Sequence, residues 1–355
     1  MQCTSSFLPA TSPFIPNKER TSKPNSLNFQ PRNKILCFSQ TYDSASDEDD
    51  DNNWQSSIKS LPLPHHLNSI TSTSNPFVKH CVKLRNSSAY RCSHGSVLLV
   101  GSTPIRELYQ FQGKMQDGKT KIECLLMLEN ADIPEDLNNL YIRRVCVSSM
   151  VMKKLSGLQS TDCLDMVALV RMPSTFRNVV DNLQEEDCRA WFPFPHRILV
   201  LDGIQDPGNL GTLLRSALAF GWDGVFLLYG CCDPFNEKAL RASRGASFQL
   251  PIVSGEWTHL KSLKEEFEMR ILAGHPANSA ESKLVSSLSR DFADSLAETP
   301  LCLVLGSEGS GLSEKSRQEC ELVSIPMAGE FESLNVSVAG GIFLYMLQPN
   351  NSGSN

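Results

Sequence analysis

The sequence predicts an α/β protein with two folded domains, the second of them built on a parallel β-sheet. The chain has 355 residues, which is enough for about two domains and terminal tails. Apolar strand-like runs alternate with helix-like segments over most of its length, and this alternation is typical of α/β architecture. Near residue 196 the alternation restarts after a stretch rich in acidic residues and proline, which indicates a boundary between domains.

The first folded domain is expected at residues 71–180, as a small α/β unit. Residues 77–85 place apolar side chains at helical spacing with basic residues between them, which favours an amphipathic helix. A helix start is expected at 104–109. Strands are expected at 96–100, 121–128, 144–147 and 166–170. Residues 181–195 are expected to be a linker.

The second domain is expected at residues 196–349. Helices are expected at 208–220 and 256–268, between apolar strand-like runs at 197–203, 224–228, 270–273, 301–305 and 322–325. Apolar runs separated by helices predict a parallel sheet that is covered on both faces. Ligands bind such sheets beyond the carboxyl ends of the strands, so the loops after residues 203, 305 and 325 form the candidate site.

The ends of the chain have the composition of unfolded segments. Residues 1–40 carry five basic residues against one acidic residue and are rich in serine, threonine and proline, which is typical of an organelle transit peptide. The richness in serine and proline favours the chloroplast over the mitochondrion, and an untargeted disordered terminus is the alternative. Residues 41–70 are expected to be a disordered acidic linker, and 350–355 a flexible tail.

Composition excludes several classes of function. No uncharged apolar run approaches about 18 residues, so no transmembrane helix is expected. The 12 cysteines are scattered without a C-x-x-C pair, which argues against a metal site and for a reducing compartment. Residues 52–150 hold 11 lysines and arginines against 7 acidic residues, whereas 196–355 hold 12 against 19. A polyanion is therefore expected to be attracted mainly by the first domain.

Two segments of the second domain carry unusual residues. Gly306, Gly309 and Gly311 directly follow a strand-like run and allow the backbone to approach a flat ligand, although a structural turn is an equal alternative. A loop after residue 325 leads to Ser333, the expected N-cap of an almost wholly apolar helix. Because this helix is apolar on all its faces, we expect it to be buried on every side, either within the core or at a subunit interface. Asn335 would then be a buried polar side chain that needs partners.

Together, three segments resemble motifs 1, 2 and 3 of the SpoU (TrmH-type) RNA 2′-O-ribose methyltransferases, which belong to the SPOUT superfamily. The segments are residues 209–217, 303–313 and 325–339, and residues 238–246 are similar to a further family segment. Residues 75–83 resemble, less specifically, the ribosomal-protein-L30e-like substrate-binding domain of the family. Met346 departs from the pattern, because an acidic residue usually closes the third motif.

The resemblance implies a deep trefoil knot in the second domain and a homodimer that buries the motif 3 helix. It implies S-adenosylmethionine as cofactor and methylation of a ribose 2′-hydroxyl in structured rRNA or tRNA, with no membrane and no metal. The implied cofactor-binding residues are Leu305, Gly306, Gly309, Ile325, Met327, Leu334 and Asn335. The implied catalytic residues are Asn209, Arg215, Glu308, Ser333 and Asn335. Candidate RNA-binding residues are Lys79, Lys83, Arg85 and Arg215.

The role of Arg215 has two interpretations. The family resemblance offers a proton acceptor, but a guanidinium is a poor base, so a phosphate clamp and stabiliser of the developing alkoxide is preferred. For the whole protein, the rival hypothesis is a non-catalytic RNA-binding or ribosome-assembly protein that retains the fold. A base methyltransferase of the wider superfamily is disfavoured by the segment from Ser333 to Asn335.

Overall fold

The structure is a computed structural model, and it describes residues 69–112, 122–129, 131, 137, 142–158, 165–179, 187–276, 284–329 and 333–349. The expected transit peptide, almost all of the expected acidic linker and the expected tail lie outside the described residues. Within the described ranges no helix is long and apolar enough to cross a membrane.

The first domain contains a five-stranded sheet with the strand order β1-β4-β3-β5-β2. Strands β1, β4 and β3 are parallel, whereas β5 runs antiparallel to both β3 and β2. The four predicted strands are confirmed to within one residue at each end. The strands are β1 Ser69–Ile70, β2 Ser96–Val100, β3 Ile122–Leu128, β4 Arg143–Val147 and β5 Met166–Arg171. The helices are α1 Pro76–Asn86, α2 Ser88–His94, α3 Ser102–Gln112 and α5 Ser149–Ser156.

Helix α1 begins where the sequence predicts it. The Asn75 side chain accepts a hydrogen bond from the Phe77 backbone N–H at 2.8 Å, and proline occupies the first helical position. At the other end, the guanidinium of Arg85 donates to the carbonyls of Lys154 and Leu155 at 3.1 and 2.7 Å. Arg85 therefore holds the last turn of α5, where backbone carbonyls lack helical partners.

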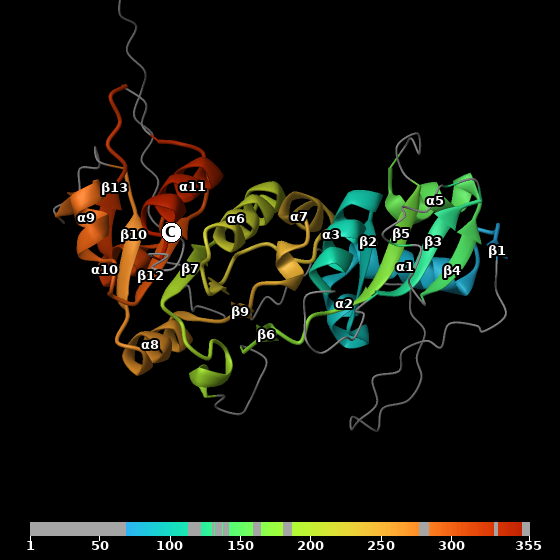
Figure 1. Cartoon of the computed structure of the whole chain (residues 1–355), viewed down its shortest axis with the longest axis horizontal. Coiled ribbons are helices and arrows are strands. Elements are labelled where there is room, and N and C mark those ends of the chain that lie inside the picture. The colour runs from blue at the N-terminus through green and yellow to red at the C-terminus, as the bar shows by residue number, and fades with distance from the viewer. Residues whose placement is uncertain are drawn as a thin grey trace, which may run out of the picture. The chain divides into compact units, whose positions relative to one another are not determined.

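The second domain contains an eight-stranded sheet, and all of its pairings are parallel. The strand order is β11-β13-β10-β12-β7-β8-β9-β6 (Figure 1). The five predicted strands are confirmed to within one residue at each end, and β6, β9 and β11 were not predicted. The strands are β6 Phe176–Asn178, β7 Arg197–Asp202, β8 Gly224–Leu227, β9 Ile252–Ser254, β10 Arg270–Gly274, β11 Val285–Ser287, β12 Leu301–Gly306 and β13 Glu321–Ser324.

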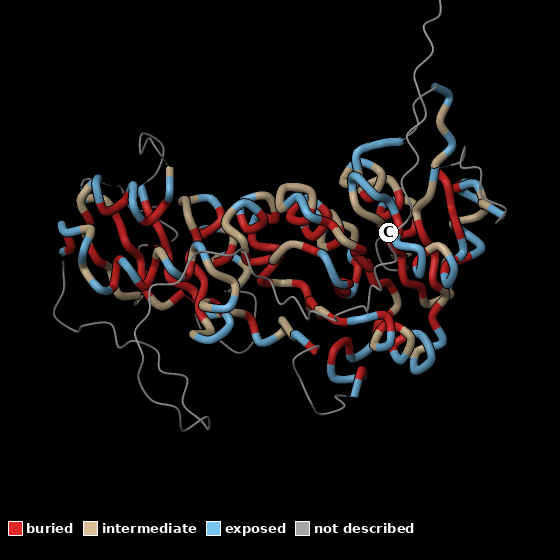
Figure 2. Tube along the Cα trace, turned by 180° about the vertical axis from the view of Figure 1, so that it is seen from behind, coloured by how far each residue is buried: buried red, intermediate tan, exposed pale blue. Residues whose placement is uncertain are grey.

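Helices cover both faces of this sheet, as predicted. Successive side chains of a strand point to opposite faces, and those of β7 divide between two apolar cores. One core includes residues of α6 (Pro207–Ala219) and α11 (Val336–Met346), and the other includes residues of α8 (Trp257–Glu266). Figure 2 shows the buried residues running along the strands. The short helices are α7 Glu237–Ser243, α9 Arg290–Ser295, α10 Glu314–Glu319 and the 3-10 turns Cys188–Ala190 and Ala246–Phe248.

The two folded domains share more structure than the sequence indicates. Strand β6, expected in the first domain, pairs with β9 of the second sheet. Trp191 and Phe192, expected in the linker, are buried in the core beneath α8. In addition, Phe235, Leu240 and Phe248 of the second domain complete an apolar core formed by β2, β3 and β5 of the first. Patterns within one segment do not reveal such long-range packing.

The prediction that Ser333 caps the apolar helix is wrong. Asn335 is the N-cap of α11, and its side chain accepts from the Ser337 backbone N–H at 2.9 Å. Both Ser333 and Asn335 are exposed, so the predicted burial of Asn335 is also wrong. Burial on every side of α11 is not found within one chain, because Val338 and Tyr345 are 53% and 56% exposed. This face of α11 is apolar and open.

Candidate functional site

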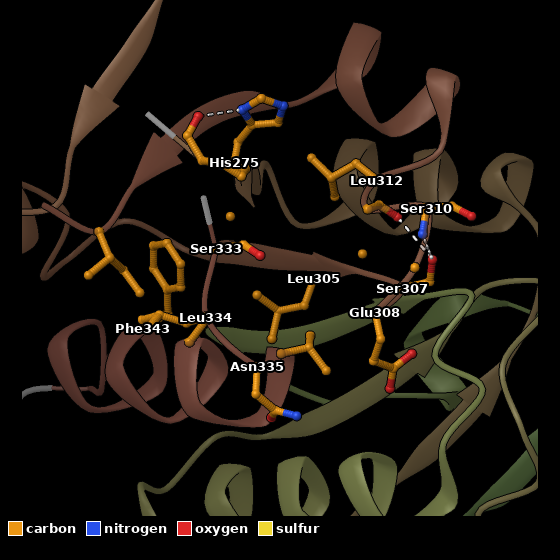
Figure 3. A pocket seen from close by; sticks show the side chains of 18 of the residues that line it. His275, Leu305, Ser307, Glu308, Ser310, Leu312, Ser333, Leu334, Asn335 and Phe343 are labelled. Atoms are coloured by element: carbon orange, nitrogen blue, oxygen red, sulfur yellow. Dashed lines mark hydrogen bonds between the residues drawn. The ribbon is translucent and has the colours of Figure 1, made fainter. Parts of the chain in front are cut away.

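A cavity of about 710 Å³ lies at the carboxyl edge of the second sheet. Its walls come from the segments that follow β10, β12 and β13 and from the first turns of α11 (Figure 3). Because these neighbouring strands are parallel, their carboxyl ends meet at one edge, which is where the sequence places the site. Ligand pockets in proteins typically measure about 300–1,000 Å³, so the cavity has room for a nucleoside-sized molecule.

The glycine-rich loop after β12 is closed by its own backbone. Ser307 and Gly311 exchange two backbone hydrogen bonds, at 2.9 and 3.0 Å. This closure brings Gly311 so near to Gly306 that a Cβ on Gly306 would lie 2.3 Å from the Gly311 carbonyl carbon. Asp202, at the end of β7, fixes the far end of the loop by accepting from the Ser313 N–H and the Ser316 hydroxyl.

The structure brings together every residue implied to bind the cofactor. All seven line the cavity, together with Glu308 and Ser333 of the implied catalytic set. The inner wall is apolar, formed by side chains such as Leu305, Leu312 and Phe343, and the rim is polar. An apolar wall beside exposed backbone groups suits a flat heterocycle with hydrogen-bonding edges.

Asn209 joins the three motif segments through its side-chain amide. The amide nitrogen donates to a carboxylate oxygen of Glu308 at 2.9 Å. The amide oxygen accepts from the side-chain nitrogen of Asn335 at 3.3 Å. Asn209 stands in the first turn of α6, where the Asp206 carboxylate caps its backbone N–H at 2.8 Å. The three polar residues thus form one connected network at the rim of the cavity.

Arg215 lies outside this network. It is exposed on α6, does not line the cavity and has no hydrogen-bond or ion-pair partner among the described residues. Its planar set of donors is therefore available to a ligand from outside.

Several cavity residues were missed by the sequence analysis. Gly274 ends β10, the parallel neighbour of β12, and His275 and Pro276 follow it, so the same sheet-edge rule would have included them. The Nδ1 atom of His275 lies 2.9 Å from the Pro276 carbonyl oxygen. Arg317 on α10 also lines the cavity. No local pattern marks Arg317, since α10 reaches the cavity only through the fold of the glycine-rich loop.

The candidate RNA-binding residues stand on α1 of the first domain. Lys79 and Lys83 are exposed one helical turn apart, and the Lys83 ammonium lies 5.6 Å from the centre of the Tyr90 ring. The guanidinium of Arg85, in contrast, is engaged with the end of α5. Among the described residues no group of three histidine, cysteine or acidic side chains is placed to hold a metal ion.

Comparison with known proteins agrees with this geometry. The model of the SpoU rRNA methylase family matches residues 196–345, the domain that contains the cavity. A protein of Synechocystis sp. described as an uncharacterized tRNA/rRNA methyltransferase is 32% identical over 290 residues, which are 80% of this chain and 94% of the relative. The chain belongs to the SpoU rRNA methylase family. As a member, it is an enzyme of the RNA methyltransferase class.

One further relative and two solved structures match over more than three quarters of the chain. The 23S rRNA (guanosine(2553)-2′-O)-methyltransferase RlmP of Bacillus subtilis is 28% identical over 288 residues, 79% of this chain and 100% of the relative. A crystal structure titled RNA 2′-O ribose methyltransferase matches with a TM-score of 0.59 at 28% identity, covering 79% of this chain and 97% of that one. The AdoMet-bound SpoU methyltransferase AviRb from Streptomyces viridochromogenes shares the fold with a TM-score of 0.60 at 24% identity.

Proposed function

We propose that this protein transfers the methyl group of S-adenosylmethionine to a ribose 2′-hydroxyl of a structured rRNA or tRNA. The observation that carries the proposal is the hydrogen-bonded network of Asn209, Glu308 and Asn335 at the rim of the cavity. Membership of the SpoU family supports the reaction class, and the 2′-O activity named for RlmP supports the ribose hydroxyl as acceptor.

The cavity suits S-adenosylmethionine on its own features. The backbone turns closely around Gly306, and Leu305 and Phe343 supply an apolar wall for the adenine ring. Leu305, Gly306, Gly309, Ile325, Met327, Leu334 and Asn335 would hold the cofactor. When bound, S-adenosylmethionine supplies an electrophilic methyl group on a sulfonium. The polar groups of Glu308, Ser333 and Asn335 in the lining would be available to an acceptor.

The acceptor hydroxyl must be oriented, and its proton passes to solvent water as the new oxygen–carbon bond forms and the methyl–sulfur bond breaks. Asn209 fixes the Glu308 carboxylate and Asn335 amide relative to one another, so these groups can orient a ribose with little reorganisation. Ser333 adds a hydroxyl at the same rim. Arg215 serves as a clamp for the adjacent phosphate and stabilises the developing alkoxide, because an unperturbed guanidinium is a poor base.

The first domain supplies the remaining RNA contacts. Lys79 and Lys83 are both exposed on α1, one helical turn apart, and lysine ammonium groups commonly contact backbone phosphates. Arg85 contributes less, because two of its hydrogen bonds are made to protein carbonyls. These lysines lie in the more basic part of the chain. Their position supports the proposal that the first domain attracts the RNA and the second domain transfers the methyl group.

The proposal includes the finer architecture of the family. We assign the second domain a deep trefoil knot and the first domain an L30e-like fold. A homodimer that covers the open apolar face of α11, which exposes Val338 and Tyr345, is part of the proposal. Val338→Glu should convert the dimer to monomer in analytical ultracentrifugation. An unchanged sedimentation coefficient would place the interface elsewhere.

We further propose that residues 1–40 direct the protein to the chloroplast. The support is their basic, serine- and proline-rich composition. A fluorescent fusion should enter plastids and lose these residues on import. Mitochondrial or cytosolic fluorescence would contradict this assignment.

The experiment that tests the proposed function is a comparison of RNA from cells with and without the gene. Ribose methylation should disappear at one or a few positions of rRNA or tRNA in the mutant, and the gene should restore it. Restoration by a Glu308→Ala variant would indicate that the protein acts as a non-catalytic assembly factor. Loss of a base methylation instead would contradict the ribose assignment.

A further inference from the structure

Tyr229 is an exposed aromatic residue beside the catalytic edge of the second sheet. It lies two residues after the end of β8 and is 74% exposed. Since β8 is parallel to β7 and β7 to β12, the end of β8 lies at the edge that carries the cavity. Most of the Tyr229 surface is therefore accessible to solvent at this edge.

The loop that contains Tyr229 runs alongside the loop that follows β7. The Leu228 N–H donates to the Leu201 carbonyl at 2.9 Å, and the Cys232 N–H donates to the Ile204 carbonyl at 2.8 Å. Between these bonds, a Cβ on Gly230 would lie 3.4 Å from the Cα of Gly203. The backbone on both sides of Tyr229 is thereby held against the segment that leads into α6.

The neighbouring loop after β7 reaches the wall of the cavity. A Cβ on Gly203 would lie 3.7 Å from the Cβ of Ser307, which lines the cavity. Burial raises the pKa of the Cys231 thiol to about 12, and the nearby carboxylates of Asp202 and Glu308 act in the same direction. The loop of Tyr229 therefore packs against the segment that contacts the cavity wall.

The charges around this loop favour a base over a phosphate. The exposed carboxylates of Asp206 and Glu308 repel an RNA backbone. Asp233 adds little charge, because it pairs with the buried Arg91. A nucleobase is neutral, and every base has a π-face that stacks on an aromatic ring.

We propose that Tyr229 stacks on an unpaired nucleobase of the RNA substrate and so positions the target ribose at the cavity. The inference rests on the proposed function and deepens it by naming a substrate-binding residue. It also specifies the substrate class: sequence-specific recognition of RNA mostly uses unstacked bases in loops and bulges, so the target lies in an unpaired segment.

The test compares Tyr229→Ala and Tyr229→Phe with a matched control, Phe194→Ala. Phe194 is 93% exposed but precedes β7, at the opposite, amino edge of the same sheet. The probes are 23S rRNA and tRNA transcribed in vitro. Three quantities are measured on the full chain: RNA affinity by filter binding, the KM and kcat for methyl transfer, and the affinity for S-adenosylmethionine.

Tyr229→Ala should weaken RNA binding and raise the KM for RNA roughly tenfold. Tyr229→Phe and Phe194→Ala should match the wild type, and the affinity for S-adenosylmethionine should not change. Equal RNA affinity of Tyr229→Ala and the wild type would overturn this inference while leaving the proposed function intact. If the wild type binds RNA but methylates neither probe, the binding comparison still decides the role of Tyr229. If the wild type binds neither RNA, the inference fails.

Discussion

The side-chain amide of Asn209 donates a hydrogen bond of 2.9 Å to the carboxylate of Glu308, 99 residues away in the chain. The bond joins the first turn of α6 to the glycine-rich loop after β12. Since the amide oxygen also accepts from Asn335, one residue holds together side chains from three separate segments. The proposed chemistry depends on this alignment.

Asn209→Ala should lower kcat for methyl transfer roughly 100-fold, because a small misplacement of the reacting groups has an effect of this size. The affinity for S-adenosylmethionine should not change, since Asn209 does not line the cavity. Thr212→Ala, one turn later on the exposed side of α6, is the control. Wild-type kcat in Asn209→Ala would show that the network is not needed for catalysis.

Gly306→Ala should abolish binding of S-adenosylmethionine. The new Cβ would lie 2.3 to 2.5 Å from backbone atoms of residues 311 and 312, so the loop must move. Such overpacking typically costs about 1–3 kcal/mol of stability. Gly309→Ala is the comparison in the same loop: Gly309 also lines the cavity, but its Cβ would meet nothing within 4 Å, so the loop can keep its fold and bind the cofactor more tightly than in Gly306→Ala. The measurement is isothermal titration calorimetry with S-adenosylmethionine. Equal affinities of the two variants would show that Gly306 does not belong to the cofactor site.

The sequence predicts the long strands well because their signal is local. Runs such as Ile198–Leu201 and Leu301–Leu305 are apolar throughout, as expected for strands buried on both faces. Strands β6, β9 and β11 have only three residues each, too few for a periodic pattern. Their structure depends on pairing with distant strands, which no local pattern reveals.

The sequence predicts the position of the cavity, and the motif segments contain most of the residues that line it. The rule for parallel sheets places it at the carboxyl edge, and the motif segments identify the loops after β12 and β13. The sequence could not show that Asn335, rather than Ser333, caps α11, because both are good capping residues and the backbone decides between them. Nor could it show that Arg317 joins the cavity wall.

Arg215→Ala should abolish methyl transfer and leave the affinity for S-adenosylmethionine nearly unchanged. The guanidinium is exposed and does not line the cavity, so its removal takes away a contact to RNA rather than to the cofactor. Arg290→Ala, which changes another exposed arginine, is the control. The test measures methyl transfer to RNA in a single turnover and the equilibrium affinity for S-adenosylmethionine. A tenfold loss of cofactor affinity would count against the assignment.

Asp233→Asn should destabilise the protein by about 3 kcal/mol, because it leaves the buried guanidinium of Arg91 without its counter-charge. The hydrogen bond from the Phe235 N–H can persist, which isolates the loss of charge. Glu237→Gln, in the more exposed pair with Arg241, should cost about 0.5 kcal/mol or less. Equal urea midpoints for the two variants would contradict a tight contact between the folded domains.

Lys79→Ala combined with Lys83→Ala should weaken RNA binding and reduce its dependence on salt. Each lost phosphate contact should lower the slope of log affinity against log salt by about 0.7. Lys261→Ala is the control, because Lys261 belongs to the acidic domain and pairs with Glu319. Point variants are preferable to deletion of residues 1–180, which would remove β6 and uncover Phe235 and Phe248. An unchanged slope would show that α1 does not contact RNA.

The central claim is tested most directly by locating the methyl group that the purified protein transfers. The protein is incubated with methyl-labelled S-adenosylmethionine and unmethylated 23S rRNA or tRNA transcripts, and the RNA is then hydrolysed with alkali. Ribose methylation blocks cleavage at the neighbouring phosphodiester, so the account predicts label in alkali-resistant dinucleotides, lost in Asn209→Ala and Arg215→Ala. Label released with mononucleotides that carry a methylated base would contradict it.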